Sequence, residues 1–583
     1  MYLGLNISHD ASAATLSDTG KLVSAISEER ITRVKNHVGL PLQSIDSLLL
    51  TDVKISRVVI GTYEQMNLHD ALRFIANLEQ NPSNPEGRWQ EVFPGFPKRK
   101  YMDMNPNLII EDILLKVFEK KGLDFPEVEW VKHHDAHLGC ALGVAGHKKH
   151  LLVSLDGEGD GESGAIAISG HKEYKVLARI SQLDSLGNLY TAVTKRYNFK
   201  PGHHEGKITG LAALGSYSAA VEVLFNHVQV KNGLPKIVRV NELKSKLLRH
   251  TIHRSGLRSS SASSLEQIVE LAELQCTNYP DLAFAVQEVL EKSVLELIKF
   301  WVEFSGISDV ALAGGVFANV KLNQKISELR QVESVKVFPN MGDGGLSVGG
   351  VWASMAKRNK EISKDPFKDM YLAPSTDKKD QEFFNTLVSN SALKIEVLDR
   401  QNWHHLCAKD VANGLLVAVH QGRMEFGPRA LGNRTLLVDP RDSGAKNHVN
   451  ARLKRTEFMP FAPVCTLERA NDFFDLPNEL QPFMYMTMTC NVRKKWQDLL
   501  PAITHVDGTA RPQLVTHESN LNLHNILKDF EKITGFPIMV NTSLNIHEEP
   551  INYSYEDTIR ALLSDAIDII YFENIKVLAS GRT

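Results

Sequence analysis

The stretch that decides the fold runs from residue 150 to residue 180. It contains three short apolar segments, His150-Leu-Leu-Val-Ser-Leu-Asp156, Gly164-Ala-Ile-Ala-Ile-Ser169 and Tyr174-Lys-Val-Leu-Ala-Arg-Ile180. A glycine-rich turn separates the first two segments, and the turn Gly170-His-Lys-Glu173 separates the last two. Short apolar runs punctuated by turn residues are typical of β-strands. The stretch therefore predicts three consecutive strands with a polar loop after the first.

The same layout occurs at the N-terminus. Strands are predicted at Tyr2–Asn6, Ala11–Leu16 and Leu22–Ser27, again with a polar turn after the first. Two similar units about 150 residues apart indicate an internal duplication, and two facing loops can hold a nucleotide between lobes. This layout resembles that of actin, sugar kinases and heat-shock chaperones. We therefore expect an α/β, actin/heat-shock-chaperone-like duplicated nucleotide-binding domain, a likeness that fixes no reaction.

The composition limits the classes of protein. At 583 residues with 43% hydrophobic residues, the chain is too long for one core and should divide into two or more domains. Lys and Arg total 66 against 69 Asp and Glu, a net charge of −3, which disfavours nucleic acid as a partner while leaving a local basic patch open.

Cysteine spacing and hydropathy bear on the compartment. The five cysteines show no paired spacing, which argues against a disulfide framework or a zinc ribbon and indicates a reducing, cytoplasmic location. The first ten residues lack a basic leader, and no apolar run approaches the ~18 residues of a membrane span. We expect no membrane association.

Candidate metal ligands lie on both sides of the first quoted strand in the sequence. In Val131-Lys-His-His-Asp-Ala-His137, a helix would place His133 and His137 on one face, where both imidazoles can reach one ion. The pair alone is a weak signal in a chain with 22 histidines. Asp156 ends a predicted strand on a glycine turn, and Asp343 does the same after the predicted strand Ser334–Phe338. Two imidazoles and two carboxylates suit Fe, Mn or Zn.

Two further glycine-rich segments could approach a phosphate or a flat ring. Glu205, Gly206 and Lys207 begin a predicted small-residue helix, where Lys207 could meet phosphate charge; a plain loop followed by a close-packed helix is the alternative. A long amphipathic helix, predicted from Asp281 to Gly306, leads to the strand that ends in Gly314-Gly-Val-Phe-Ala-Asn319.

The second half begins after the charged segment Lys357–Asp365, which we interpret as a linker. A predicted strand, Leu415–His420, leads into Gly422-Arg-Met-Glu-Phe-Gly-Pro-Arg-Ala-Leu-Gly-Asn-Arg-Thr435. Guanidinium groups match phosphate oxygens, and the interleaved Gly, Pro and Ala favour a shaped loop over a solvated helix face. This stretch is the predicted anion cradle, with three arginines: Arg423, Arg429 and Arg434.

The order of these motifs resembles the NodU/CmcH carbamoyltransferase family nearly from end to end. The residues that carry the resemblance are His9-Asp10, Glu28-Glu-Arg30 to Lys35, His133-x-x-x-His137, Asp156-Gly-Glu-Gly-Asp160, Glu205-Gly-Lys207, Gly314-Gly-Val-Phe-Ala-Asn319 and Gly342-Asp-Gly-Gly345. The resemblance implies a domain over 1–357 similar to the universal tRNA threonylcarbamoyl-transfer protein. It implies a second α/β domain over 370–583 similar to the carbamoyl-adenylate-forming partner of that protein.

The resemblance also implies residue roles. His133, His137, Asp156 and Asp343 would hold an iron-type metal, Fe²⁺ or another divalent transition metal, and His9 would be the general base. Nucleotide or carbamoyl adenylate would lie against Lys35, Gly157, Glu158, Gly159, Asp160, Glu205, Gly206, Lys207, Gly314, Gly315 and Asn319. Carbamoyl phosphate or ATP would bind in the second domain at Arg423, Arg429, Lys454, Arg455, His505, Arg511, Asn541 and Ser543. Thr456 and Met459 depart from the Arg-Glu and Arg-Pro of several relatives, which puts residues 455–459 in doubt.

The implied reaction has two stages, with ATP and carbamoyl phosphate as substrates and Mg²⁺ as a further candidate cofactor. Carbamoyl adenylate would form in the second domain and carbamoylate a hydroxyl of a sugar, an antibiotic or another small molecule in the first. The alternatives are a tRNA-modifying threonylcarbamoyl enzyme, an ATPase or kinase of the same fold, and a non-enzymatic metal or nucleotide sensor. The irregular residues 64–105 are either surface decoration or the acceptor-binding loop. A homodimer would be compatible with the family.

Overall fold

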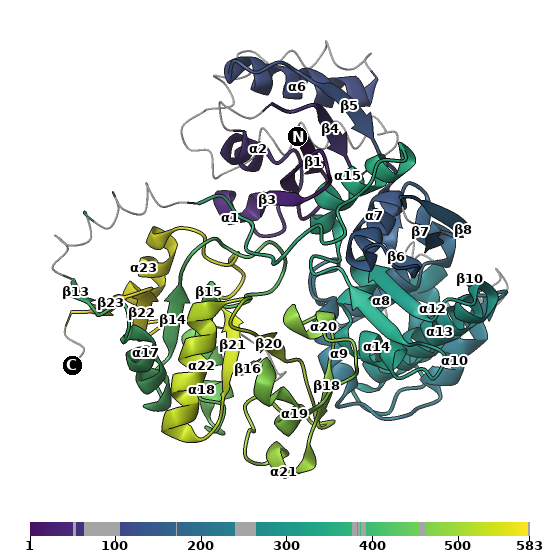
Figure 1. Cartoon of the computed structure of the whole chain (residues 1–583). Helices are drawn as coiled ribbons and strands as arrows, with labels where there is room; N and C mark the ends of the chain where they lie inside the picture. The colour runs from purple at the N-terminus through teal and green to yellow at the C-terminus, as the bar shows by residue number, and fades with distance from the viewer. Residues whose placement is uncertain are drawn as a thin grey trace.

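The computed structural model describes most of the chain, and its elements are shown in Figure 1. The described residues are 1–49, 54–62, 105–170, 172–238, 264–375, 382, 385, 392–454 and 461–580. The residues 64–104 of the proposed acceptor loop, and Arg455 with Thr456 and Met459, lie outside them.

The first domain contains two five-stranded sheets with the same topology. The first sheet has the order β3-β2-β1-β4-β5 and comprises β1 (Tyr2–Asn6), β2 (Ser12–Leu16), β3 (Leu22–Ser27), β4 (Arg57–Ile60) and β5 (Glu127–Trp130). The second has the order β12-β11-β6-β7-β8 and comprises β6 (Leu151–Gly159), β7 (Glu162–Ser169), β8 (Tyr174–Ser181), β11 (Asp309–Ala313) and β12 (Ser334–Val337). In each sheet the first three strands are antiparallel and the last two join in parallel. The predicted duplication is therefore confirmed, with strand ends within a few residues of those expected.

Two helices pack against each other between these sheets. Helix α7 (His133–Ala145) follows β5, and α15 (Leu346–Lys357) follows β12 after the short helix η3 (Asp343–Gly345). The helices meet closely, because a Cβ atom on Gly139 would lie 2.0 Å from the carbonyl oxygen of Gly349. The two equivalent strand-to-helix turns are thus brought to the same place, which is the feature that builds the site.

Further helices cover the outer faces of the two sheets (Figure 1). The first sheet is covered by α1 (Glu28–Thr32), α2 (Leu42–Leu48) and α6 (Pro106–Lys120). The second is covered by η1 (Gln182–Asp184), α8 (Leu186–Arg196), α13 (Asp281–Ser305), η2 (Gly315–Ala318) and α14 (Val320–Ser327). Around these helices pack α9 (Glu205–Ala212), α10 (Ala220–His227), the hairpin β9 (Val228–Lys231) and β10 (Leu234–Ile237), and α12 (Ser264–Glu273).

The second domain is built on an eight-stranded mixed sheet of order β13-β23-β22-β14-β15-β21-β16-β20. Its strands are β13 (Leu393–Val397), β14 (Val417–His420), β15 (Arg434–Val438), β16 (Ala462–Thr466), β20 (Gln513–Val515), β21 (Ile538–Ser543), β22 (Ile569–Phe572) and β23 (Ile575–Ala579). Alternate strand residues face two cores, one with α17 (Trp403–Ala412) and α22 (Leu521–Thr534), the other with α18 (Ala445–Arg452) and α23 (Tyr555–Leu563). A small subdomain contains η4 (Leu467–Arg469), α19 (Ala470–Phe473), β17 (Phe474–Asp475), α20 (Gln481–Met484), β18 (Cys490–Val492), α21 (Lys494–Gln497) and β19 (Thr509–Ala510).

The segment after α15 joins the two domains along the edge of the first sheet. Backbone amides of β3 donate to Pro366 and Leu372, and the amide of Leu372 in turn donates to Met424 of the second domain. All five cysteines are free. Among the described residues, no helix has the length and apolar character needed to cross a bilayer.

Candidate active site

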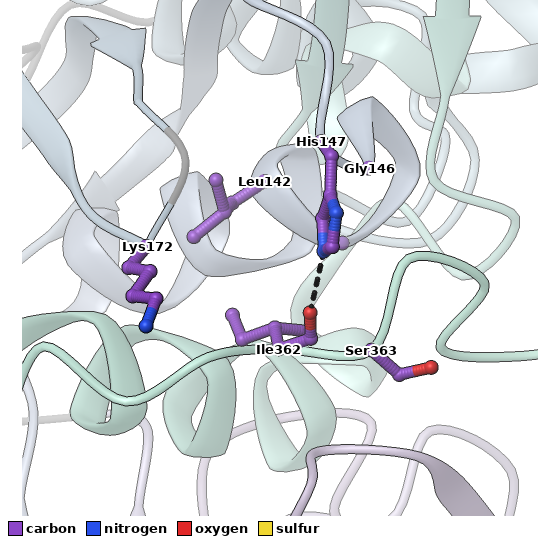
Figure 2. A pocket seen from close by; sticks show the side chains of 7 residues that line it. Leu142, Gly146, His147, Lys172, Ile362 and Ser363 are labelled. Carbon is purple, nitrogen blue, oxygen red and sulfur yellow. Dashed lines mark hydrogen bonds between the residues drawn. The ribbon is translucent and has the colours of Figure 1, made fainter.

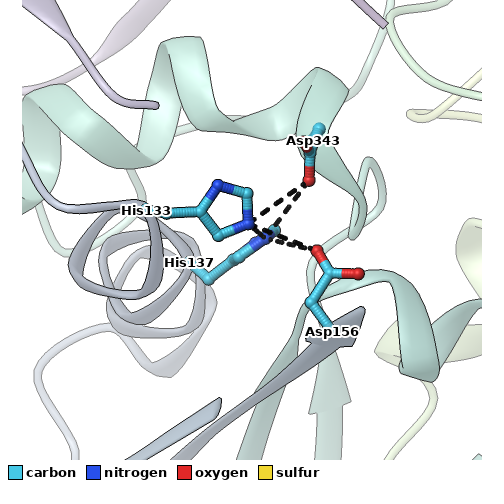
Figure 3. A group of neighbouring side chains, drawn as sticks. All are labelled: His133, His137, Asp156 and Asp343. Atoms are coloured by element: carbon cyan, nitrogen blue, oxygen red, sulfur yellow. Dashed lines mark hydrogen bonds and ion pairs between the residues drawn. The ribbon is translucent and has the colours of Figure 1, made fainter. Parts of the chain in front are cut away.

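Four predicted ligands meet where the two halves of the first domain face each other (Figure 3). His133 and His137 lie on the first turns of α7, and their Nε2 atoms are 3.2 Å apart. The Asp156 Oδ2 atom, from β6, lies 3.0 Å from His137 Nε2 and 3.4 Å from His133 Nε2. The Asp343 Oδ1 atom, from η3, lies 3.5 Å and 3.6 Å from the same two nitrogens.

The donor set fits a metal ion. Ligand atoms at bonds of roughly 2.0–2.2 Å from one ion are separated by about 3–3.6 Å in tetrahedral or octahedral geometry, which is the spacing of the two imidazole nitrogens from each other and from both carboxylates. The Oδ1 atom of Asp343 is buried without a hydrogen-bond donor, a costly arrangement that a cation would relieve. Although burial opposes it, the neighbouring carboxylates of Asp156 and Asp343 raise the pKa of His137 to about 9. These groups therefore favour a positive charge at their centre.

Glycines allow the ligands to approach each other. A Cβ atom on Gly159 would lie 2.2 Å from the ring of His133, and one on Gly315 would lie 2.7 Å from Asp156 Oδ1. Asp160, in the same glycine turn, fixes the start of α7, because its carboxylate accepts a hydrogen bond of 2.8 Å from the backbone amide of His133. The glycines expected to contact nucleotide thus also make room for the cluster.

His9 lies beside the cluster on the loop between β1 and β2. Its Nε2 atom is 3.2 Å from Asp343 Oδ2, which also accepts a hydrogen bond of 2.8 Å from Ser8 Oγ. The side chain is 55% exposed, so a substrate can reach it. The charge of Asp343 is the main reason that the pKa of His9 is raised to about 10. A cation bound between the carboxylates would offset this effect.

The other residues expected near the nucleotide lie at different places around this centre. Lys35 is exposed on the loop after α1. Glu205 accepts hydrogen bonds from Gly202 and Thr191 at the start of α9, and the Lys207 ammonium lies 5.6 Å from the ring of Phe199. Asn319 bonds to Gln287 and caps α14. Glu158 accepts a hydrogen bond from the side chain of Asn188. Gly157, Gly206 and Gly314 have only backbone atoms to offer a ligand.

A second charged centre lies in the second domain. The Nε atoms of Arg429 and Arg511 are buried without a hydrogen-bond partner, and neither guanidinium pairs with a carboxylate in the described part of the chain. Burial lowers the pKa of Arg429 to about 10. Burial, and then the charge of Arg429, lowers the pKa of Arg511. Two neighbouring cations held together without an acidic partner make a site for an anion.

The loop that carries Arg429 is fixed from behind. Glu425 Oε1 accepts hydrogen bonds from the amides of Leu431, Asn433 and Arg434. Asn541 Nδ2 donates to the carbonyl oxygen of Ala430 over 3.1 Å. The Asn541 side chain is buried, so in this arrangement it supports the loop from within.

The remaining candidates of the second domain differ in their contacts. Arg423 donates to the carbonyl oxygens of Ala373, Leu372 and Val23, and thereby ties the two domains together. Arg434 is buried and donates to backbone carbonyl oxygens of residues 421, 422 and 433. Lys454 is exposed just after α18, His505 lies 3.2 Å from Asp507, and Ser543, which pairs with Thr435 on the neighbouring strand, bonds to Asn545.

Sequence reasoning assigned no role to Ser8, Asp10 or Asn36, which surround His9. Asp10 Oδ2 lies 3.1 Å from His9 Nδ1, and Asn36 Nδ2 donates to Asp10 Oδ1 over 2.7 Å. Both Asp10 and Asn36 have positive φ, 56° and 53°. The available signal was an Asp beside a candidate catalytic histidine, since nothing in the local sequence ties residue 36 to residue 10.

A small hollow elsewhere lies at the end of α7, against the segment that follows α15 (Figure 2). Its lining includes His147, whose Nε2 atom lies 2.9 Å from the carbonyl oxygen of Ile362. Lys172 faces it and lies 3.5 Å from Glu361. His147 and Lys172 therefore both have partners, and none of the residues that line the hollow belongs to either charged centre.

Comparison with known families identifies the class of protein. The family models described as "Carbamoyltransferase N-terminus" and "Carbamoyltransferase C-terminus" match residues 1–352 and 408–578. The chain therefore belongs to the carbamoyltransferase family and is an enzyme of carbamoyl transfer.

Individual relatives match over most of their length. Nodulation protein NolNO of Sinorhizobium fredii is 29% identical over 96% of this chain and 77% of its own. Nodulation protein NolO of Bradyrhizobium diazoefficiens is 30% identical over 75% of this chain and 77% of its own. An uncharacterised protein of Methanocaldococcus jannaschii is 28% identical over 98% and 99%.

Solved structures show more remote likenesses. HypF of T. kodakarensis aligns with a TM-score of 0.29 and 12% identity over 63% of this chain and 48% of its own. A ROK family glucokinase of Streptomyces griseus aligns with a TM-score of 0.28 and 15% identity over 61% and 99%. At these scores the fold assignment rests on the strand topology described above.

Proposed function

We propose that this carbamoyltransferase is ATP-dependent and transfers the carbamoyl group of carbamoyl phosphate to a hydroxyl of a small molecule through carbamoyl adenylate. The observation that carries the proposal is the pair of guanidinium groups of Arg429 and Arg511, held together without a carboxylate partner. Such a pair stabilises phosphate oxygens by charge-assisted hydrogen bonds. The metal cluster with His9 supplies a separate centre for the transfer.

In the first stage, carbamoyl phosphate is hydrolysed to carbamate and phosphate in the second domain. A carbamate oxygen then attacks the α-phosphorus of ATP, the bond to the β-phosphate oxygen breaks, and pyrophosphate leaves. Arg429 and Arg511 bind and orient the phosphate groups and neutralise the charge that develops on them. The loop that Glu425 and Asn541 hold keeps the Arg429 guanidinium in place, so its reorganisation costs little.

In the second stage, the hydroxyl oxygen of the acceptor attacks the carbamoyl carbon of carbamoyl adenylate in the first domain. The bond to the AMP oxygen breaks, and His9 takes the hydroxyl proton at Nε2. His133, His137, Asp156 and Asp343 would hold a divalent transition metal, which we propose to be Fe²⁺, and which would supply positive charge to polarise the carbamoyl oxygen. Lys35 is proposed to contact the adenylate.

Keeping both centres on one chain has a physical advantage. Carbamoyl adenylate is a mixed anhydride that water destroys, so a short protected path preserves it. The two domains are tied near the loop that carries Arg429: Arg30, at the end of the motif before Lys35, donates to the carbonyl oxygen of Gly427 over 2.9 Å. Gly427 is two residues from Arg429 in the anion-site loop.

The proposal is tested by measuring pyrophosphate release from ATP with and without carbamoyl phosphate. We expect release to require carbamoyl phosphate, and the mass of a hydroxyl acceptor to increase by one carbamoyl group. Screening sugars, glycosides and antibiotics by intact mass would identify the acceptor class. Pyrophosphate release that is unchanged when carbamoyl phosphate is omitted contradicts the proposal.

A further inference from the structure

A chain of side-chain contacts runs from the four candidate metal ligands through His9 to a second loop of the first domain. His9 Nε2 faces Asp343, and its Nδ1 atom faces Asp10 Oδ2 at 3.1 Å. The other carboxylate oxygen of Asp10 accepts a hydrogen bond from Asn36 Nδ2. Asn36 Oδ1 is in turn hydrogen-bonded to Nδ1 of His203, on the loop before α9.

The backbone around Asp10 is held independently of His9. Asn6 Nδ2 donates to the carbonyl oxygens of His9 and Asp10, and Asn6 Oδ1 accepts from the amide of Ser8. Thr62 Oγ1 also donates to Asn6 Oδ1, over 2.7 Å. The carboxylate of Asp10 is therefore presented by a rigid loop, and its position does not depend on the imidazole that it contacts.

Asn36 is fixed equally well. Its backbone amide donates to Glu29 Oε2 over 2.7 Å, and Glu29 pairs with Arg30. The backbones of the two loops are also joined, because the amide of Ala11 donates to the carbonyl oxygen of His37. The carboxylate that faces His9 Nδ1 is thus held in turn by a second anchored side chain.

We infer that Asp10 is the positioning residue of His9 in the transfer step, and that Asn36 holds Asp10 in place. The carboxylate accepts the Nδ1 proton of His9, which fixes the tautomer and directs Nε2 toward Asp343 and the reacting hydroxyl. Without this contact the half-exposed ring can rotate, and Nε2 is presented in the productive direction for a smaller fraction of the time. This inference rests on the proposed function of His9.

The donor and acceptor pattern of the network permits a swap experiment. Each oxygen of Asp10 accepts from a different donor, one on His9 and one on Asn36. In Asp10→Asn, the new side-chain NH₂ group therefore faces an N–H donor, either that of His9 or that of Asn36. Asp10→Asn combined with Asn36→Asp restores every match, because the amide at position 10 donates to the new carboxylate, which also accepts from His203. Both substitutions are compatible with positive φ, which Asn and Asp tolerate.

The experiment measures pyrophosphate release and acceptor carbamoylation for the full chain and its variants. Asp10→Asn and Asp10→Gly should lower the kcat of transfer by about 100-fold with little change in the acceptor KM, while pyrophosphate release shows that each variant is folded. The double swap should regain at least about tenfold of that loss, a recovery that a purely structural role would not give. Asp565→Asn, at an exposed Asp of the second domain that also has positive φ (63°), is the control and should leave transfer unchanged.

The outcomes are distinct. Transfer at the wild-type rate by Asp10→Asn and Asp10→Gly, or a double swap no better than Asp10→Asn, overturns the positioning role while leaving the proposed function intact. A wild-type protein that releases pyrophosphate but carbamoylates no hydroxyl compound overturns the proposed function, and the inference with it.

Discussion

Asp343 bridges His9 and the candidate metal ligands: its Oδ2 atom lies 3.2 Å from His9 Nε2, and its Oδ1 atom lies 3.5 Å from His137 Nε2. One carboxylate therefore connects the proposed base to the proposed metal. Because the carboxylate comes from the turn between β12 and α15 in one half and His137 from the helix that follows the equivalent strand β5 in the other, the duplicated fold itself creates the connection.

Asp343→Asn should weaken metal binding. The substitution removes a negative charge from the ligand set while keeping the size of the side chain, so we expect metal affinity to fall by at least about tenfold. The measurement is metal content by elemental mass spectrometry after dialysis against a defined metal buffer. Asp309→Asn, at a buried aspartate that pairs with Lys148 in the same domain, is the control. Equal metal content in the Asp343→Asn variant and the wild type would argue against a metal at this cluster.

Gly315→Ala should damage the same cluster by steric means. A Cβ atom there would lie 2.7 Å from Asp156 Oδ1, so the carboxylate must move away from the two histidines. We expect metal affinity to fall by about tenfold or more. Gly342→Ala is a close control, because a Cβ atom at this neighbour of Asp343 meets nothing within 4 Å. If the two variants bind metal equally well, Asp156 is not a ligand.

Arg511→Met should separate stability from activity. The free protein loses a buried cation beside Arg429, so its melting temperature should stay the same or rise, and the stabilisation given by added phosphate should disappear. Pyrophosphate release should fall by about 100-fold. Arg434→Met should behave in the opposite way, losing about 2–4 kcal/mol of stability because its carbonyl partners lose their donors. Thermal shift with and without phosphate distinguishes the two, and a destabilised Arg511→Met variant that still responds to phosphate would refute the anion site.

Arg33→Met should loosen the contact between domains. The guanidinium donates to the carbonyl oxygens of Pro550 and Ile551 over 2.8 Å, and lies 3.3 Å from Asp557. Loss of these bonds should cost about 1–3 kcal/mol. Limited proteolysis of the segment between the domains, compared with Arg469→Met at a surface ion pair within the second domain, provides the measurement. Cleavage at the wild-type rate would show that other contacts hold the domains together.

Much of the fold was predictable because strand periodicity and turn residues are local signals. The six strands of the repeated units, the helix from Asp281 and the strand ending at His420 were predicted close to their observed ends. The convergence of His133 and His137 follows from helical spacing. That of Asp156 and Asp343 was suggested by the motif order, and the structure places all four together.

Other features could not be predicted because they depend on tertiary contacts. Arg423, Arg429 and Arg434 look equivalent in the sequence, yet Arg423 and Arg434 bond to backbone carbonyl oxygens and only Arg429 lies beside Arg511 without an acidic partner. Nothing in the sequence indicated that the amide of Asn541, a candidate for the binding cleft, would support the loop that carries Arg429. Likewise, Asn36 reaches Asp10 only because two loops are paired in space.

The central claim is that activation and transfer occur at separate centres, and His133→Ala tests it most directly. The variant removes one imidazole from the cluster and leaves the Arg429 and Arg511 pair untouched. We predict that it still releases pyrophosphate in the presence of ATP and carbamoyl phosphate, at a rate near that of the wild type, while carbamoylating no acceptor. Loss of both activities in a variant that remains folded would contradict the division between the two domains.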